Sequence, residues 1–354
     1  MDDKHENHLS ENAVSNVSAD GTRPHKNGGI MNTLYPPGPK PGAGGRMKNH
    51  CRKFWWCDLL VVAVIVLVIV LPVVYVAIPK KAQNDLDKST LEVTMQNVSS
   101  PKTDQVHLKL VTLAKSSSKF HPTLDGFRGA LHLKDKEPFL YIDIPTVKAD
   151  AETTITVDQD VKFADLGRFT EYNEVVISSE SFDVYLDGKT KIHQKGLKAI
   201  TADYNKVITM KGLNGLKGLN ITDLKVLDKP NSDGSNMEGN VFIPNPSVMT
   251  LYLGNVTMNL AVDGKAIGTS LLPELTLKPG DNNVPMLSTV NQTTVIGLIY
   301  GKDAKYKNAI LPLTITGNSS VVGKDHLTYY ETAIKGNKVN VDLNVGPALA
   351  SILG

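Results

Sequence analysis

The residues best suited to catalysis follow residue 80, and their spacing matches no common catalytic pattern. Five histidines are scattered there without metal-ligand spacing: His107, His121, His132, His193 and His326. No GxSxG elbow, HExxH motif or P-loop occurs, and no cysteine follows Cys57. The usual hydrolase, metalloprotease, nucleotidase and thiol mechanisms therefore lack their central group. We predict that the protein is not an enzyme and uses no cofactor or metal, and that these histidines are solvated.

Two other groups of residues suggest chemistry that their pattern does not support. Asp143 and Asp183 could pair across strands as the carboxylates of a glycosidase do, but the sequence gives no distance between them. The segment 212–218 (GLNGLKG) lacks the GxGxxG spacing and is not followed by a helical pattern, so we interpret it as turns or bulges. Three nearby lysines are expected to solvate a surface: Lys206, Lys211 and Lys217.

Composition and charge exclude several classes of protein. The 354 residues are 41% hydrophobic and 21% charged, an ordinary globular balance that excludes disorder throughout. With a net charge of +2, no part is basic enough to hold nucleic acid by counterion release. Cys51 and Cys57 are the only cysteines, so neither a disulfide framework nor a Cys-rich zinc site organises the bulk of the chain.

One uncharged run predicts a membrane span. Residues 59–78 read LLVVAVIVLVIVLPVVYVAI, and as a helix they would cross roughly 30 Å of hydrocarbon. Trp55 and Trp56 lie on one side of the run and Tyr75 near its other end, as an aromatic belt requires. The competing interpretation, a cleaved signal peptide, conflicts with the distance from the N-terminus and the missing small-x-small site. We predict a transmembrane helix over 54–79.

The distribution of cations predicts the orientation of that helix. Four precede it closely: Arg46, Lys48, Arg52 and Lys53. Only Lys80 and Lys81 follow it closely, so the positive-inside rule leaves the N-terminus in the cytosol and gives a type II, single-pass signal-anchor topology. Residues 1–53 are poor in large apolar side chains and are expected to form a disordered cytosolic tail.

The tail carries two short signals. Pro36 and Pro39 have PxxP spacing, which suits either a stiff spacer or a ligand for an aromatic groove. Cys51 and Cys57 lie beside the membrane, where they are either palmitoylated or ordinary reduced thiols.

Acceptor sites for N-glycans support the orientation. Five Asn-x-Ser/Thr triplets follow the span: Asn97, Asn220, Asn255, Asn291 and Asn318. Because such triplets also arise by chance, they support the topology without deciding it. If they are used, the outer part is a bulky glycoprotein.

Alternating apolar residues predict β-structure after the span. In 256–262 (VTMNLAV) the apolar residues share one face, and Asp263–Gly264 follows as a hairpin turn. Phe182, Val184 and Leu186 form a similar stripe before Asp187–Gly188, where we expect a second hairpin.

The two stripes belong to longer, similar units. In each, a methionine follows the aspartate by 23 residues, as Met210 and Met286 do. We therefore predict an all-β lumenal region of two tandem fibronectin/Ig-like sandwiches, 85–210 and 211–354, with one large elongated β domain as the alternative.

The stretches GNVFIPNPS (239–247), VTMNLAVDGKAIG (256–268) and LPELTLKPGDNNV (272–284) resemble the plant late-embryogenesis-abundant group 2 (water-stress and hypersensitive-response) domain. Residues 181–280 are also similar to a fungal membrane-protein family of unknown function, through 198–224 and 243–257. The resemblance implies a fibronectin-like β-sandwich on one span, in a vacuolar or related endomembrane. It also implies structural turns at Asn245–Pro246, Asp263–Gly264–Lys265 and Pro279–Gly280, and no active site.

Two functions remain as hypotheses. The first is a non-catalytic lumenal module that binds an unknown lumenal or membrane protein. The alternative is binding of lipid or another apolar ligand by the β-sandwich region, because apolar strands lie close to the bilayer. The vacuolar or another endomembrane is the expected location, with the plasma membrane or the endoplasmic reticulum as alternatives.

Overall fold

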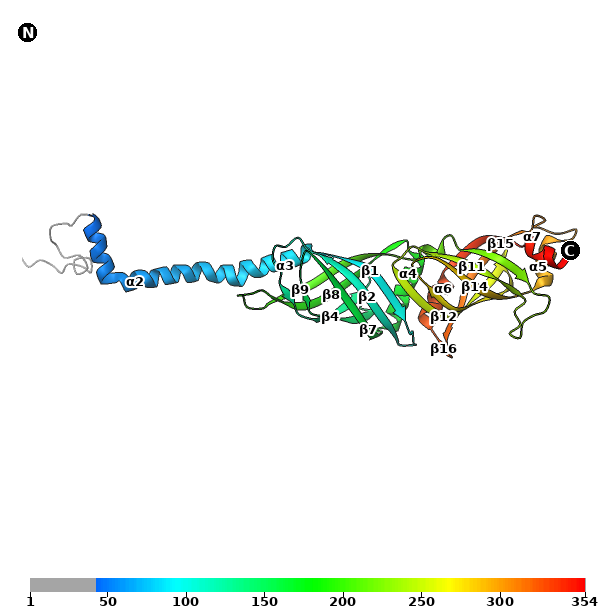
Figure 1. Cartoon of the computed structure of the whole chain (residues 1–354), viewed down its shortest axis with the longest axis horizontal. Helices are drawn as coiled ribbons and strands as arrows, with labels where there is room; N and C mark the ends of the chain where they lie inside the picture. The colour runs from blue at the N-terminus through cyan, green and yellow to red at the C-terminus, as the bar shows by residue number, and fades with distance from the viewer. Residues whose placement is uncertain (1–42, 354) are drawn as a thin grey trace, which may run out of the picture. The chain divides into compact units, whose positions relative to one another are not determined.

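The computed structural model describes the backbone of residues 43–353 and the side chains of residues 55–350 (Figure 1). The chain divides into two compact units, one ending at Ile69 and the other running from Val70 to the C-terminus. The PxxP signal and most of the tail lie outside the described residues, and so does the side chain of Cys51.

The N-terminal helical segments carry the apolar run. They are α2 (Ala43–Pro72), the π-helical turn η1 (Val73–Ala77) and α3 (Ile78–Lys88). Pro72 has no backbone N–H to donate, and a π-helical turn follows it directly. Trp55–Lys88 forms a helix long and apolar enough to cross a bilayer. Such a helix was predicted over 54–79, and in the structure it continues to Lys88.

Strands make up most of the second unit, which confirms the β-rich prediction. Their bounds are β1 (Thr90–Ser99), β2 (Gln105–Lys115), β3 (Thr123–Leu124), β4 (Phe127–His132), β5 (Leu140–Ile144), β6 (Val147–Lys148), β7 (Glu152–Lys162), β8 (Ser181–His193), β9 (Ile200–Lys211), β10 (Asn220–Val226), β11 (Met237–Asn245), β12 (Met249–Val262), β13 (Lys265–Leu277), β14 (Gly280–Val290), β15 (Ile310–Val322), β16 (Asp325–His326) and β17 (Lys338–Asn344).

These strands form two sheets. The larger has the order β10-β11-β14-β13-β12-β1-β2-β7, with β15 pairing β12, β16 and β17. The smaller has the order β5-β4-β8-β3-β6, with β9 pairing β8. The inward residues of both sheets belong to one continuous hydrophobic core. That core buries alternate residues of several strands, as in β9, where Ala202, Tyr204 and Ile208 are buried.

Strand β12 connects the early strands to the late ones. Its residues 249–251 pair in parallel with 96–98 of β1, and its residues 255–262 pair antiparallel with β15. Gly254, between these two stretches, has a φ of +71°, and a Cβ there would lie 2.5 Å from the carbonyl oxygen of Val321. One sheet therefore contains strands from both sides of residue 211. The division into two tandem sandwiches stays a prediction.

Three α-helices lie between the strands of the described chain and a fourth follows β17, although no helical pattern was expected after Ser89. They are α4 (Leu166–Ser178), α5 (Gln292–Ile299), α6 (Thr328–Gly336) and α7 (Gly346–Leu353). Asp165 caps α4 by accepting a hydrogen bond of 2.8 Å from the backbone N–H of Arg168. Phe169 and Tyr172 of α4 and Tyr329 and Tyr330 of α6 are buried and form part of an aromatic cluster with Phe139 and Phe163.

One of the two predicted hairpin turns is present, and the prediction of the other is wrong. Asp263 and Gly264, with φ of +52° and +76°, join β12 to β13 in a two-residue turn. Asp187 and Gly188 instead lie inside β8, which continues straight to His193. Gly188 is required there by packing, because a Cβ would lie 2.5 Å from the ring of Phe127.

Candidate functional site

Each of the five histidines after the span lies beside a carboxylate, which their scattered spacing did not indicate. The pairs are His107 with Asp160 (2.7 Å) and Asp158 (3.0 Å), His121 with Asp150 (3.0 Å), His132 with Asp187 (3.0 Å), His193 with Asp125 (2.9 Å) and His326 with Glu331 (2.6 Å). Among the side chains of residues 55–350, no group of His, Cys, Asp and Glu is arranged to hold a metal ion.

The other residues with possible chemistry are not brought together. Asp143 lies on β5 and Asp183 on β8, with β4 between these strands, so the two do not face each other across adjacent strands. Asp183 instead accepts a hydrogen bond of 2.6 Å from the Thr209 hydroxyl. The glycine segment forms a short turn against α4, where a Cβ on Gly212 would lie 2.3 Å from the carbonyl oxygen of Ser179.

The predicted glycan sites and turns lie in different settings. Asn220, Asn291 and Asn318 are exposed, whereas Asn97 and Asn255 are half-buried within β1 and β12. The Asn291 side chain also caps α5 by accepting a hydrogen bond from the backbone of Thr294. The remaining turn residues lie at strand ends: Asn245 ends β11, Pro246 follows it, Pro279 precedes β14 and Gly280 begins it.

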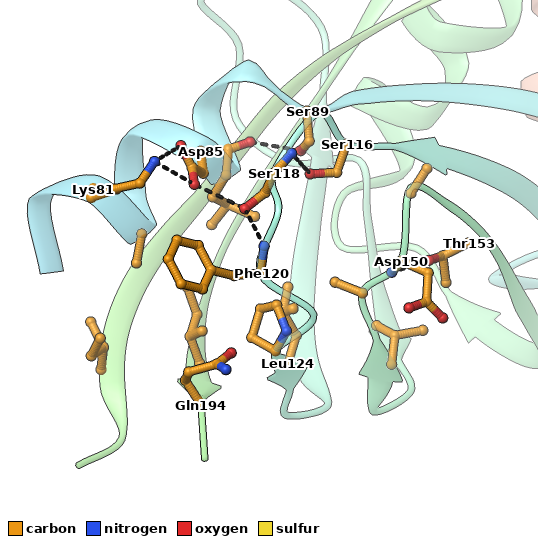
Figure 2. Close-up of a pocket in the computed structure, with 18 of the residues that line it drawn as sticks. Lys81, Asp85, Ser89, Ser116, Ser118, Phe120, Leu124, Asp150, Thr153 and Gln194 are labelled. Carbon is orange, nitrogen blue, oxygen red and sulfur yellow. Dashed lines mark hydrogen bonds and ion pairs between the residues drawn. The ribbon is translucent and has the colours of Figure 1, made fainter. Parts of the chain in front are cut away.

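A largely apolar pocket of about 310 Å³ opens in the second unit beside α3 (Figure 2). Its apolar wall is formed by the end of η1, α3, β2, β3, β6–β9 and their loops: Ala77, Ile78, Ala82, Leu86, Ala114, Phe120, Pro122, Leu124, Val147, Ala149, Ile155, Ile192, Leu197 and Ile200. Tyr204 lines it too, and burial raises the pKa of its hydroxyl to about 12, so this group stays neutral.

Contacts with β9 fix α3 at the side of the pocket. The side-chain amide of Gln83 donates to the carbonyl of Asp203 (2.8 Å) and its oxygen accepts from the N–H of Asp203 (3.0 Å), as a paired strand would. The amine of Lys206 donates to the carbonyl oxygens of Leu86 (2.5 Å), Asp87 (3.2 Å) and Ser89 (2.6 Å), where the helix ends.

The expectation that Lys206 solvates a surface is therefore wrong. Lys206 is 6% exposed, and its alternate position in β9 turns it inward beside the buried Tyr204 and Ile208. Burial lowers the pKa of its amine, against the smaller opposing effect of Asp87.

The segment 116–122 forms one edge of the pocket mouth. Ser118 donates a hydrogen bond of 2.9 Å to Asp85 of α3, and Lys81 donates one of 3.1 Å to the same carboxylate (Figure 2). His121 lies 3.0 Å from Asp150 of the neighbouring loop, whose Ala149 donates to the carbonyl of Pro122. Burial acts to raise the pKa of Asp85, but the hydrogen bonds from Lys81 and Ser118 outweigh it and hold that pKa below its usual value.

One polar atom in the pocket wall has no partner. The side-chain oxygen of Gln194 is buried and receives no hydrogen bond from the described residues. An unpaired buried acceptor is costly, so the site favours a molecule that donates a hydrogen bond there. Apart from this atom and the polar edge, the pocket offers apolar contact, which suits an apolar ligand.

The sequence did not reveal this pocket, because its wall combines residues from 77 to 204 whose proximity depends on sheet topology. The one available signal was that the helix continues beyond its apolar run. Ala82 and Leu86 are four residues apart, and Lys81 and Asp85 are four apart as well, as helical neighbours are.

Comparison with known sequences identifies one matching family. The model for a protein of unknown function (DUF3712) matches residues 137–260, from the turn before β5 to Leu260 of β12. This agrees with the expected similarity to a family of unknown function, and the match covers less than half of the chain. The fungal and late-embryogenesis-abundant resemblances remain predictions. No curated protein matches the chain.

Solved structures show only distant similarity. A Mobiluncus mulieris adhesin with intramolecular disulfide, isopeptide and ester cross-links is 11% identical, with a TM-score of 0.18, over 70% of this chain and 84% of the adhesin. The periplasmic chaperone SfaE is 11% identical, with a TM-score of 0.16, over 72% of this chain and 100% of the chaperone. Such low scores support no inference about function.

Proposed function

We propose that the protein is a membrane-anchored, non-catalytic binding protein whose β domain holds one apolar chain of a lipid beside the bilayer. The observation that carries this proposal is the apolar pocket, whose wall includes Ala77 and Ile78, the last two residues of the apolar run. A volume of about 310 Å³ lies at the lower end of the range for small-molecule sites, which suits one acyl chain better than a whole phospholipid.

The energetics favour such a ligand. Each buried methylene contributes about 0.8 kcal/mol, so ten would contribute about 8 kcal/mol before the cost of ordering the chain. Gln194 supplies an acceptor for a hydroxyl or amide N–H near the end of that chain. This makes an apolar chain with a hydrogen-bond donor, such as a protonated fatty acid or a hydroxylated lipid, a better ligand than a pure hydrocarbon.

The experiment compares lipid that co-purifies with variants of the full chain. Ala114→Phe and Ala149→Phe fill the pocket, whereas Ala261→Phe enlarges a half-buried alanine of β12 outside it. We expect mass spectrometry to find roughly one lipid more per wild-type and A261F protein than per A114F or A149F protein. Equal lipid content in all four proteins would reject the proposal.

The proposed topology follows from the sequence. Residues after the span are assigned to the lumen of a vacuole or another endomembrane on the distribution of cations around residues 59–78. The support is Trp55–Lys88, a helix able to cross a membrane, and the exposed positions of Asn220, Asn291 and Asn318.

Protein interaction is the second candidate, favoured by large apolar side chains that stay exposed. Ile296, Tyr300 and Ile310 are 38%, 50% and 39% exposed near α5. Affinity purification of the full chain should then recover a stoichiometric partner. The double variant Tyr300→Lys with Ile296→Lys should lose this partner, and the pocket variant A114F should keep it. Recovery of the same proteins with both variants would contradict it.

A further inference from the structure

We infer that the mouth of the apolar pocket rests on the bilayer that the chain's own helix spans, with Phe120 inserted among the lipid headgroups. This surface, the pocket rim, consists of Lys81, the loop residues Lys119 and Phe120, and Lys195 and Lys198 of the β8–β9 loop. The inference rests on the proposed function in one part: the rim is the route by which the lipid chain enters the pocket.

Chain connectivity places the rim at the membrane. Ile78 is the last residue of the apolar run and lies in the pocket wall. Lys81 follows it by three residues, which is about 4.5 Å along a helix. Since α3 is fixed to β9 through Gln83 and Lys206, the pocket begins at the depth where the apolar run ends.

Phe120 has the properties of an interfacial anchor. Its side chain is 52% exposed at the pocket mouth, and the amine of Lys81 lies 5.7 Å from its ring centroid (Figure 2). An exposed phenylalanine is unfavourable in water, whereas aromatic rings and snorkelling lysines are favoured together at the bilayer surface. The hydrogen bond from Ser118 to Asp85 holds this loop against α3, so the ring is presented from a fixed position.

The charges of the rim complement lipid phosphates. Lys119, Lys195 and Lys198 are exposed on the two loops that line the mouth. The two acidic residues there are already engaged, since Asp85 accepts from Lys81 and Ser118, and Asp150 pairs with His121. The exposed cations are therefore available to phosphate oxygens. A rim in contact with the bilayer lets an acyl chain reach the pocket without crossing water.

The test places a fluorophore on the rim of the full chain in phosphatidylcholine vesicles. Cysteines 51 and 57 are replaced by serine, and NBD is attached at Phe120→Cys or at the control Tyr300→Cys. Tyr300 is 50% exposed, and its neighbouring helix α5 lies at the opposite end of the second unit from α3 (Figure 1). The quencher is a spin label on the lipid headgroup, which is too polar to enter the pocket.

We expect headgroup-labelled lipid to quench NBD at position 120 at least threefold more than at position 300. Adding anionic lipid should strengthen the quenching at 120, and replacing Lys119, Lys195 and Lys198 by glutamine should remove that increase. Equal quenching at the two positions would overturn the inference. If lipid still co-purified while quenching was equal, only the contact between the rim and the bilayer would be rejected. If position 120 was quenched but no lipid co-purified, lipid binding by the pocket would be rejected and the contact of the rim would stand.

Discussion

Lys206 couples the β domain to the helix that continues the apolar run. Its amine lies within hydrogen-bond distance of three carbonyl oxygens at the end of α3, and the side chain reaches them through the interior. Helix ends normally leave such carbonyls to water or to a capping group. Ser89 caps α3 through its backbone N–H and hydroxyl, which both donate to Leu86, and Lys206 adds donors for Asp87 and Ser89 as well. Lys206 therefore completes the cap and holds one pocket wall in position.

Replacing Lys206 by methionine should keep most of the buried volume and remove the three hydrogen bonds from its amine to the end of α3. We expect a loss of about 1–3 kcal/mol in the free energy of unfolding, because the carbonyls of Asp87 and Ser89 lose their donor, whereas Leu86 keeps its bonds from Ser89. Thermal unfolding of the full chain in detergent would measure it. Lys191→Met, at an exposed position of β8, is the control, and an equal effect of both substitutions would contradict this role.

His107 makes stability depend on pH. The hydrogen bond to Asp160 raises the pKa of the imidazole above its usual value, burial opposes this, and Asp158 adds to the increase. A raised folded-state pKa stabilises the protein fully below about pH 6.5, and this stabilisation is lost as the pH rises through the folded value. Because the ring is 36% exposed, water screens the pair and we expect less than about 1 kcal/mol.

The measurement is the difference in unfolding temperature between wild type and His107→Gln. It should be larger at pH 5.5 than at pH 9, and Asp160→Asn should reduce it at low pH. A difference that stays constant with pH would show that His107 acts through packing alone.

Single residues also show where sequence patterns mislead. The step Asp263–Gly264 and the step Asp187–Gly188 have the same residue types, but only the first is a turn. Gly264 has open space where a Cβ would be, whereas Gly188 is pressed against Phe127. A glycine therefore indicates either a turn or a close approach, and local sequence does not distinguish the two.

The sequence of α4 contains a helical pattern that the search for alternating strand residues overlooked. Asp165 is an N-cap, and buried residues follow at positions 169, 172, 173, 176 and 177, which is the spacing of one helix face. A search for strands splits this pattern because its aromatic and β-branched residues also suit sheets. The strands and their apolar faces were predictable, whereas α5–α7 are too short for periodicity to identify with certainty.

The aromatic cluster between α4 and α6 should contribute strongly to the free energy of unfolding of the β domain. Phe169 is 2% exposed and stacks 4.0 Å from Phe163, so Phe169→Ala should cost about 3–5 kcal/mol. Leu166→Ala, at a position 43% exposed on the same helix, should change stability by no more than about 0.5 kcal/mol. Trypsin resistance and thermal unfolding would measure both, and equal losses would show that the cluster has no special role.

Over the whole chain, the two predictable properties were the β-rich region and the helix able to cross a membrane. The pocket was not predictable, because its wall combines α3 with strands up to Tyr204 and depends on which strands are neighbours. Strand pairing such as that of β1 with β12 joins residues more than a hundred positions apart, and alternation alone does not specify it.

The topology predicts which glycan acceptors are used. If the β domain is lumenal, Asn220, Asn291 and Asn318 should carry glycans because they are exposed, and Asn97 and Asn255 should stay bare within their strands. Replacing each asparagine by glutamine should therefore increase gel mobility at three positions only. No glycosidase-sensitive shift in the wild type would contradict the lumenal assignment.

The most direct test of the central claim maps where a lipid chain touches the protein. The full chain is placed in vesicles that contain phosphatidylcholine with a diazirine at the end of one acyl chain, and the photo-adducts are located by peptide mass spectrometry. The pocket predicts adducts on two stretches of its wall, 114–155 and 192–204, in addition to the span at 59–78. Ala114→Phe should remove the adducts in the wall and keep those in the span. Adducts confined to the span in the wild type would contradict the claim.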